Sequence, residues 1–385
     1  MIDACDKCLR RAFLVAHLAP RIAGLLDRPA RRIGGLLALP NDAFVEATAG
    51  KDRDAAWTFL HEFQVALARE ALAGLRVVAL CRHADDYPPP VKELVDPPAV
   101  LFGLGTLEAL RALREEPAVT VVGSRRASPY GSEVAYSLGR GLGAAGVPVV
   151  SGLAVGIDGT AHRGCLDGSG LTVAVLACGP DVVYPRRHRR LYDRIRAAGV
   201  VLSELPPGTR PFRWSFPARN RIMAALARMT VVVEAGEPSG SLITADFARD
   251  LGRAVAAVPG RVTSSIARGT NGLLRDGAVP VTGTEDVLDE LFGVGVRRAP
   301  PAAEERPEPA DPRQRAVLEA AERFSSIDAV ARELNLSASQ VRAALGSLEA
   351  EGWLVRRDLG GGNEPRPDHN SIASRTPPRR ALGRT

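Results

Sequence analysis

Short apolar runs alternate with helical segments through the middle of the chain, from about residue 100 to residue 295. The runs are too short for helices and rich in valine and alanine, and most end on glycine or serine: 119–122, 148–151, 171–178, 200–203, 230–234 and 254–258. Such runs are typical of inner parallel strands joined by crossover helices. The pattern predicts an α/β sheet, and because parallel strands end at one edge, the loops that follow them should line one cleft.

The turn after the first of these strands, GSRRASPYG (123–131), has the composition of an anion site. Ser128 is placed to cap a helix whose first residue is Pro129. Backbone N–H groups at that helix start, the Ser124 hydroxyl and the Arg125 guanidinium would all face one phosphate. The alternative is a surface turn with solvated arginines, which the recurrence of similar loops downstream disfavours.

A second basic segment, RPFRWSFPARNRIMAALAR (210–228), interleaves arginines with aromatic residues. No acidic residue lies between Glu204 and Glu234. Arginines bind phosphates, and rings and guanidinium planes stack on unpaired bases, so the segment favours single-stranded nucleic acid over duplex. The alternative is that Trp214 and Phe216 are core residues, and we expect this of at least one of them.

Length, charge and missing motifs limit the function further. A chain of 385 residues should hold two or three domains, and its net charge of +6 favours a polyanionic partner. It has no run of 18 apolar residues and no signal-peptide core, so we expect a cytoplasmic protein without a membrane partner. Gly141, Gly143 and Gly146 spell GxGxxG, but they end a helix and precede a strand, which is the reverse of a dinucleotide site.

The five cysteines include a C-x-x-C pair, Cys5 and Cys8, and a C-x-H pair, Cys81 and His83. An odd number of cysteines in a cytoplasmic chain argues against a disulfide framework. Three thiolates and one imidazole would complete a closed structural zinc site. The alternative is that these are four unrelated residues, because the two pairs are far apart in the sequence.

The remaining segments divide the chain. Residues 1–80 have helical periodicity, the proline-rich stretch 84–99 predicts an extended linker, and 297–312 predicts a flexible connector. Residues 311–360 predict a winged helix: three helices at 314–323, 326–334 and 338–349, followed by WLVRRDLG as the wing. Its third helix is only modestly basic, so duplex DNA and protein are equal candidates as its partner. Residues 361–385 should be disordered.

The expected core of the predicted winged helix consists of Val317, Leu318, Ile327, Val330, Leu334, Val341, Leu345 and Leu348.

In this order, GSRRASPYG, SGLAVGIDGTAH, FPARNRIMAAL, SGSLITA and VPG followed by GTNGLLRDGA span residues 100–290. They resemble the motif series of the DprA (DNA processing protein A, or Smf) family. The resemblance implies an extended Rossmann-like fold, a homodimer, binding of single-stranded DNA, and loading of a RecA-type recombinase onto it in natural transformation or related recombination. Tyr87-Pro88 and Asp96-Pro97-Pro98 are similar to family elements that lead into the Rossmann-like domain. The resemblance implies that the region before them is a sterile-alpha-motif-like helical module.

With the resemblance, the predicted DNA-binding residues are Gly123, Ser124, Arg125, Arg126, Ser128, Gly152, Phe216, Arg219, Asn220, Arg221, Gly240 and Ser241. Ser124 and Arg125 would hold a DNA phosphate in a basic pocket that Arg219 and Arg221 also line. Asp158 and His162 match the family's GIDxxAH element and are expected to orient the pocket loops.

The alternative function is a nucleotide-binding Rossmann-like enzyme of the phosphoribohydrolase type, which also places a Gly/Ser-rich loop after a strand ending in glutamate, here Glu234. The position of its catalytic glutamate is occupied by Ala245 or Asp246, which weakens this alternative. A hydrolase built on Ser151, Asp158 and His162 lacks a nucleophile elbow. We therefore expect no enzymatic activity, and no cofactor except a structural zinc.

Overall fold

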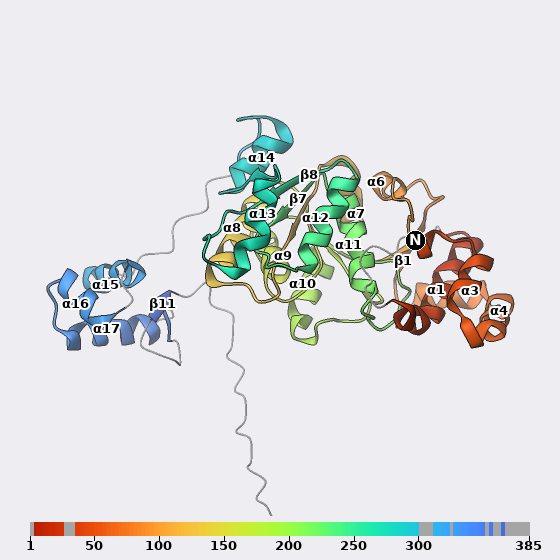
Figure 1. Cartoon of the computed structure of the whole chain (residues 1–385), viewed down its shortest axis with the longest axis horizontal. Coiled ribbons are helices and arrows are strands. Elements are labelled where there is room, and N and C mark those ends of the chain that lie inside the picture. The colour runs from red at the N-terminus through yellow and green to blue at the C-terminus, as the bar shows by residue number, and fades with distance from the viewer. Residues whose placement is uncertain are drawn as a thin grey trace, which may run out of the picture. The chain divides into compact units, whose positions relative to one another are not determined.

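The computed structural model describes residues 4–26, 35–299, 311–323, 326–350, 354–356 and 363–365. The chain divides into two compact units, Met1–Pro300 and Pro301–Thr385 (Figure 1). Among the described residues, no helix has both the length and the apolar character needed to cross a membrane. The connector predicted at 297–312 falls largely outside the described residues, as does the predicted tail apart from residues 363–365.

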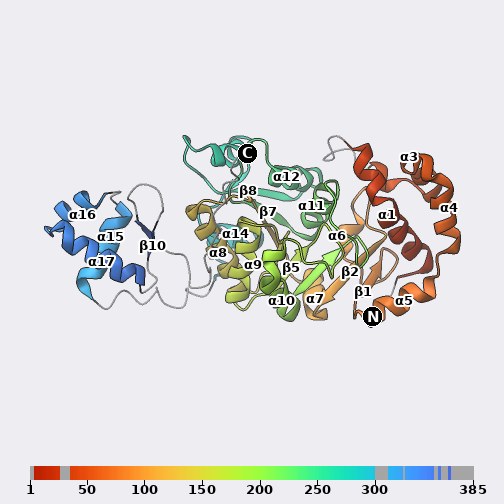
Figure 2. The same cartoon turned by 90° about the horizontal axis from the view of Figure 1, so that it is seen from below.

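The first unit is built on a nine-stranded sheet (Figure 2). Its strands are β1 (Val78–Cys81), β2 (Val100–Gly105), β3 (Val119–Val122), β4 (Val149–Ser151), β5 (Thr172–Val175), β6 (Val200–Ser203), β7 (Met229–Val232), β8 (Ala254–Ala257) and β9 (Val279–Pro280). Their order is β1-β2-β6-β5-β4-β3-β7-β8-β9. Neighbours from β6 to β9 are parallel, whereas β2 pairs antiparallel with β1 and β6. The expected parallel sheet is confirmed, and it is extended by an antiparallel edge.

Helices cover both faces of this sheet. On one face apolar side chains pack against the sheet from α6 (Pro89–Lys92), α7 (Leu107–Glu115), α11 (Ser215–Leu226), α12 (Gly240–Asp250) and α13 (Arg268–Arg275). On the other face lie α8 (Pro129–Ala144), α9 (Ile157–Asp167), α10 (Arg189–Ala198) and α14 (Thr284–Phe292). Short 3₁₀ turns occupy Gly50–Asp52, Arg186–His188 and Ser265–Ala267.

The glycines that spell GxGxxG belong to α8 and the turn after it, as the sequence predicts. Gly141 and Gly143 lie in the last turns of α8, and Gly146 follows them with φ +74°. A Cβ on Gly143 would lie 2.6 Å from the Cys165 carbonyl oxygen of α9. These glycines therefore serve helix packing and chain reversal.

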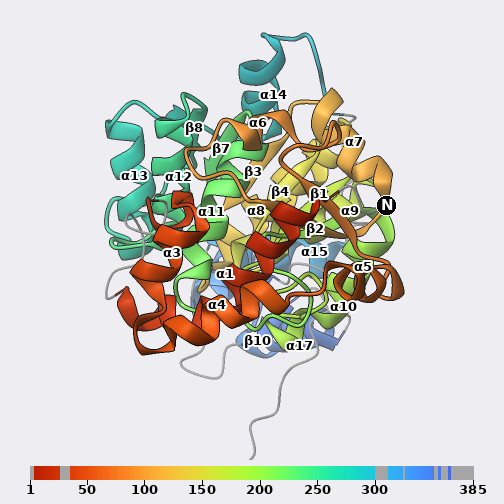
Figure 3. The same ribbon diagram turned by 90° about the vertical axis from the view of Figure 1, so that its right-hand side faces the viewer.

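Four helices lie beside the edge strands β1 and β2, nearest the viewer in Figure 3: α1 (Asp6–Leu25), α3 (Asn41–Thr48), α4 (Arg53–Glu62) and α5 (Val65–Gly74). Trp214 joins their core, with an exposed fraction of 1%, and its indole Nε1 donates to the Ala19 carbonyl at 3.0 Å. The expectation that Trp214 or Phe216 is a core residue is therefore correct for Trp214.

The proline-rich stretch 84–99 is not an extended linker. Tyr87, Val91 and Leu94 are buried in the core of the sheet, and the Tyr87 hydroxyl donates to the Pro98 carbonyl at 2.8 Å. The prediction was wrong because it rested on the proline content of the segment, whereas these apolar side chains fix the segment to the sheet.

The second unit contains α15 (Pro312–Arg323), α16 (Ile327–Glu333) and α17 (Ala338–Ala350), with an antiparallel pair β10 (Leu354–Arg356) and β11 (Asn363–Pro365). Val317, Val330, Val341, Leu345 and Leu348 are buried in its core, and the other predicted core positions pack against them. Three helices followed by a two-stranded hairpin are the predicted winged-helix arrangement. Its second strand, β11, lies in the segment 361–385, so the prediction that this segment is disordered is wrong for residues 363–365.

Candidate functional site

The chain leaves β3 for β4 on one side and later returns to β7 on the other side of β3. In open α/β sheets, ligands bind outside the carboxyl ends of the strands at such a switch point. A cavity of about 540 Å³ opens there, lined by residues of 122–126, 216–223 and 236–244. The predicted convergence of the strand-end loops is therefore realised at the ends of β3 and β7.

Nine of the twelve predicted binding residues line this cavity: Gly123, Ser124, Arg125, Arg126, Phe216, Arg219, Asn220, Gly240 and Ser241. The structure brings the segment 122–126 together with two segments, 216–223 and 236–244, that follow it by 90 or more residues in the sequence. Ser128, Gly152 and Arg221 are not among the lining residues.

Arg125 and Arg126 supply the available positive charge of the cavity. Both side chains are exposed, and within the described part of the chain neither forms an ion pair. The Arg125 guanidinium lies over the Phe216 ring, with 5.1 Å between its carbon and the ring centroid. This contact holds a cation beside an aromatic face without neutralising it.

An exposed aromatic residue that the sequence analysis did not select extends this surface. The ring centroids of Tyr184 and Phe216 are 5.8 Å apart, and 44% of Tyr184 is exposed. The signal that would have identified Tyr184 was its place at the end of LTVAVLACGPDVVYP, directly before the exposed arginines Arg186 and Arg187.

The first turn of α12 faces the cavity through Gly240 and Ser241. Ser239 caps this helix, and its Oγ accepts a hydrogen bond from the Ser241 amide at 3.4 Å. The Asn220 amide donates to the Gly240 carbonyl at 3.1 Å, which fixes the start of α12 against α11. A helix start held in this way directs its positive end at the cavity.

Ser128 caps α8 as predicted, with its Oγ accepting from the Gly131 amide at 3.0 Å. Its own amide and hydroxyl donate to the Glu234 carboxylate at 2.9 and 2.5 Å. These contacts tie the start of α8 to the chain after β7, and Ser128 therefore has a structural contact in place of the predicted ligand contact. Gly131 has no room for a side chain, because a Cβ there would lie 2.3 Å from the Glu234 carboxylate.

Arg219 is buried, with an exposed fraction of 5%, and holds the ends of two strands. Its Nη1 donates to the carbonyls of Gly152 and Val175, and its Nη2 lies 3.8 Å from an Asp158 carboxylate oxygen. Burial raises the pKa of Asp158 and Arg219 opposes that rise. Gly152 contributes by leaving space, because a Cβ there would lie 2.2 Å from the Arg219 guanidinium. Asp158 therefore orients the cavity loops, as expected.

The expectation that Arg221 lines the same pocket is wrong. Only 1% of Arg221 is exposed, and its guanidinium donates to Asp96 at 2.9 Å and to both Glu204 carboxylate oxygens at 2.9 and 2.8 Å. Burial disfavours its charge, but Glu204 and Asp96 outweigh that cost and raise the pKa of Arg221. The reason is helical geometry: residues two apart on α11 point about 200° away from each other, so Arg219 and Arg221 face opposite ways.

Ser151, Asp158 and His162 do not form a hydrolase triad. The Ser151 hydroxyl donates to the Val121 carbonyl at 2.6 Å, and His162 Nδ1 lies 2.7 Å from the Thr172 hydroxyl oxygen. Burial, with His188 and Arg219 nearby, lowers the pKa of His162 to about 3, so its imidazole is neutral near pH 7.

Two family models match separate parts of the chain. A family model described as DNA recombination-mediator protein A matches residues 78–292, and one described as the DprA winged helix domain matches residues 300–360. The chain is 44% identical over 271 residues to the putative DNA processing protein DprA of Mycobacterium tuberculosis, which covers 68% of this chain and 67% of that protein. It is 36% identical over 275 residues to protein Smf of Escherichia coli, covering 70% and 72% of the two chains.

Two solved structures are similar to this one. The X-ray structure of DNA processing protein A from Streptococcus pneumoniae aligns with a TM-score of 0.59 and 33% identity, over 74% of this chain and 96% of that chain. A structure of DNA processing protein A from Helicobacter pylori, which concerns its single-stranded DNA binding mode, aligns with a TM-score of 0.50 and 29% identity, over 56% and 95%.

Proposed function

The chain belongs to the DNA recombination-mediator protein A (DprA/Smf) family, and from this premise we propose that it binds single-stranded DNA in the cavity between β3 and β7. The observation that carries the proposal is the pair of exposed, unneutralised guanidiniums of Arg125 and Arg126, which follow β3 and line the same cavity as the start of the 11-residue helix α12. A polyanion gains most where cations are exposed and have no carboxylate partner.

The geometry favours a backbone phosphate at the cavity and unpaired bases beside it. Ser124, Arg125 and the start of α12 surround the place for a phosphate. Phe216 and the exposed Tyr184 present ring faces next to it, and bases of a single strand can stack on such faces. Duplex DNA keeps its bases stacked inside, so it could use the arginines but not the rings.

The binding proposal is tested with the full chain, a fluorescently labelled oligothymidine and anisotropy over a range of salt concentrations. An Arg125→Gln/Arg126→Gln double variant should bind at least tenfold more weakly. If both residues contact phosphates, the slope of log K against log salt should become shallower by about 1.4, which is two contacts at about 0.7 each.

Arg228→Gln is the matched control, because Arg228 is an exposed arginine outside the cavity. This variant should keep the affinity and the slope of the unaltered protein. A double variant that binds as tightly as the control, with the same slope, would contradict the proposed pocket.

We also propose that the bound strand is delivered to a RecA-type recombinase by a homodimer of this chain in the cytoplasm. The support is the family description as a recombination mediator. Strand exchange with the cognate recombinase and single-strand-binding protein should speed up when the chain is added, and sedimentation should give twice the mass of one chain. No stimulation by a chain that binds DNA normally would refute delivery while leaving the binding proposal intact.

The phosphoribohydrolase alternative has less support from the site. Glu234, on which it depends, accepts both hydrogen bonds of Ser128 and does not line the cavity. We therefore propose a binding protein without catalytic activity. Release of free base from nucleoside monophosphates by the purified chain would overturn this.

A further inference from the structure

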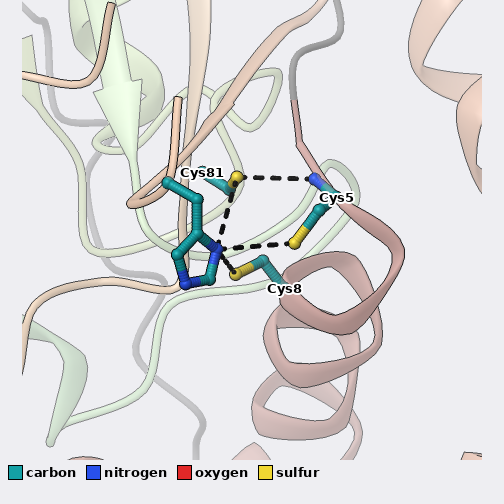
Figure 4. Close-up of side chains that lie close together, drawn as sticks. Cys5, Cys8 and Cys81 are labelled. Atoms are coloured by element: carbon teal, nitrogen blue, oxygen red, sulfur yellow. Dashed lines mark hydrogen bonds between the residues drawn. The ribbon is translucent and has the colours of Figure 1, made fainter. Parts of the chain in front are cut away.

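A second cluster of chemically active side chains lies far from the cavity, where α1 begins. Cys5 precedes α1, Cys8 lies in its first turn, and Cys81 is the last residue of β1 (Figure 4). His83 follows in the next turn. Among the described residues, their three sulfurs and one imidazole nitrogen all lie within 4.8 Å of one another. Cys8 and Cys81 are buried, with exposed fractions of 2% and 1%, whereas His83 is exposed.

We propose that these four side chains bind one zinc ion in a closed tetrahedral Cys₃His site. The sulfurs of Cys8, Cys5 and Cys81 lie 3.4, 3.5 and 4.0 Å from the His83 Nδ1 atom. Zn–S bonds of about 2.3 Å and Zn–N bonds of about 2.0 Å at tetrahedral angles place sulfur and nitrogen about 3.5 Å apart, and two sulfurs about 3.8 Å apart. Each sulfur thus already stands near the separation from the nitrogen that the metal requires, and the sulfurs lie within 4.8 Å of one another.

The surroundings also fit a metal thiolate. The Cys5 backbone amide donates to the Cys81 sulfur at 3.4 Å, the kind of N–H contact that stabilises sulfur in the deprotonated form. On binding, the three thiols lose their protons to solvent and the imidazole binds in its neutral form, so no oxidant or reductant is needed. Four protein donors leave no position for substrate water, which makes the site structural.

The position of the site in the fold shows which parts of the chain a bound zinc ion would join. It connects residues 5 and 8 with residues 81 and 83, which are 73 to 78 positions away in the sequence. The start of α1 and the edge of the sheet also share a small apolar core, which includes Leu9 and Ala12 of α1 and Val100 and Phe102 of β2. A zinc ion here would fasten the helical module to the edge of the sheet that carries the DNA cavity.

A disulfide is the main competing use of these cysteines. Within the described residues, no disulfide joins any of the five cysteines. A disulfide would use two of the three clustered sulfurs. It would not account for the position of the third sulfur and the imidazole beside them. The two uses differ in the mass of the chain, because a disulfide removes two hydrogen atoms, whereas a bound zinc ion adds the mass of the metal.

The test is metal analysis of the purified full chain, together with its mass under native and denaturing conditions. We expect one zinc per chain, and after exchange with cobalt we expect thiolate-to-metal charge-transfer bands and the red d–d bands of tetrahedral Co²⁺. Removing the metal with a strong chelator should speed tryptic cleavage of residues 1–80 at least about tenfold, because the clamp on α1 is lost.

Variants separate ligation from folding. Cys81→Ser should lower the zinc content to near zero, and His83→Ala should weaken retention against a chelator at least tenfold. Because His83 is exposed, the second variant should still fold. Cys178→Ala is the matched control: it removes a buried thiol outside the cluster, and it should keep one zinc per chain. The proposal is overturned if the unaltered chain holds no zinc and takes none up, or if its mass shows a disulfide among these cysteines.

Discussion

Replacing Arg221 should lower the free energy of unfolding without changing the cavity between β3 and β7. Arg221→Met keeps an unbranched aliphatic stem but removes the guanidinium, which leaves Asp96 and Glu204 buried, with side-chain exposures of 6% and 10%, and without their cation. Removing one partner of a buried ion set costs about 3–5 kcal/mol. An unfolding entropy of about 2.1 cal/mol/K per residue gives about 0.6 kcal/mol/K for the 300-residue first unit, so its Tm should fall by roughly 5–8 °C.

The pH dependence of this loss has a definite sign. Burial raises the pKa of Asp96 and Arg221 opposes the rise, so the pKa climbs further in the variant. A carboxyl group with a folded pKa above its unfolded value binds more protons in the folded state, and its stability cost therefore grows as pH rises. The gap in unfolding free energy between Arg221→Met and the unaltered chain should narrow as pH falls from 7 toward 5.

Denaturant unfolding and oligothymidine binding measure the two effects separately. Arg228→Met is the control, because this exposed arginine follows the same helix and its loss should cost no more than about 0.5 kcal/mol. The combined Arg221→Met/Asp96→Asn/Glu204→Gln variant should regain part of the stability, since no buried charge is left unpaired. The reasoning fails if Arg221→Met is as stable as the control, or if it weakens DNA binding tenfold while remaining stable.

Three further outcomes follow from the site. Phe216→Ala should weaken binding of single-stranded DNA by about 1–3 kcal/mol in anisotropy and leave duplex binding unchanged, and equal losses on both would remove the stacking role. Gly131→Ala should lower Tm because its Cβ would meet the Glu234 carboxylate at 2.3 Å, whereas the open position Gly74→Ala should not. His162, whose folded pKa of about 3 lies below its usual 6.5, should cost the chain up to about 1.4 kcal/mol per pH unit as pH falls below 6.5. His162→Gln should show a shallower decline in denaturant titrations, and parallel curves would contradict this.

Local pattern was enough to predict much of the fold. The strands from β3 to β8 are short buried runs, and the winged-helix core has helical spacing, so both are specified by residues close together in the sequence. The same holds for Ser128, whose capping role depends on its neighbours Pro129 and Gly131. The segment 84–99 was wrongly predicted to be an extended linker, because the burial of Tyr87 depends on a sheet formed by distant residues.

The site was predictable in composition but not in the direction of its side chains. Arg219 and Arg221 share a motif, yet the direction of each depends on its place around α11, and the partners of Arg221 lie 17 and 125 positions away in the sequence. The cysteine cluster shows the same limit. Its residue types indicated zinc, but only the packing of α1 beside β1 brings Cys81 and His83 close to Cys5 and Cys8.

The arginines around the cavity therefore divide into two groups with different physical roles. Arg219 donates hydrogen bonds to the Gly152 and Val175 carbonyls and forms an ion pair with Asp158, so it has little left for a ligand and instead holds the strand ends in place. Arg125 and Arg126 have no carboxylate partner among the described residues, so their charge is available to a phosphate. Because the first group is already ordered before binding, a DNA strand need not organise the cavity. Its affinity should then depend on the exposed pair and on the rings beside it.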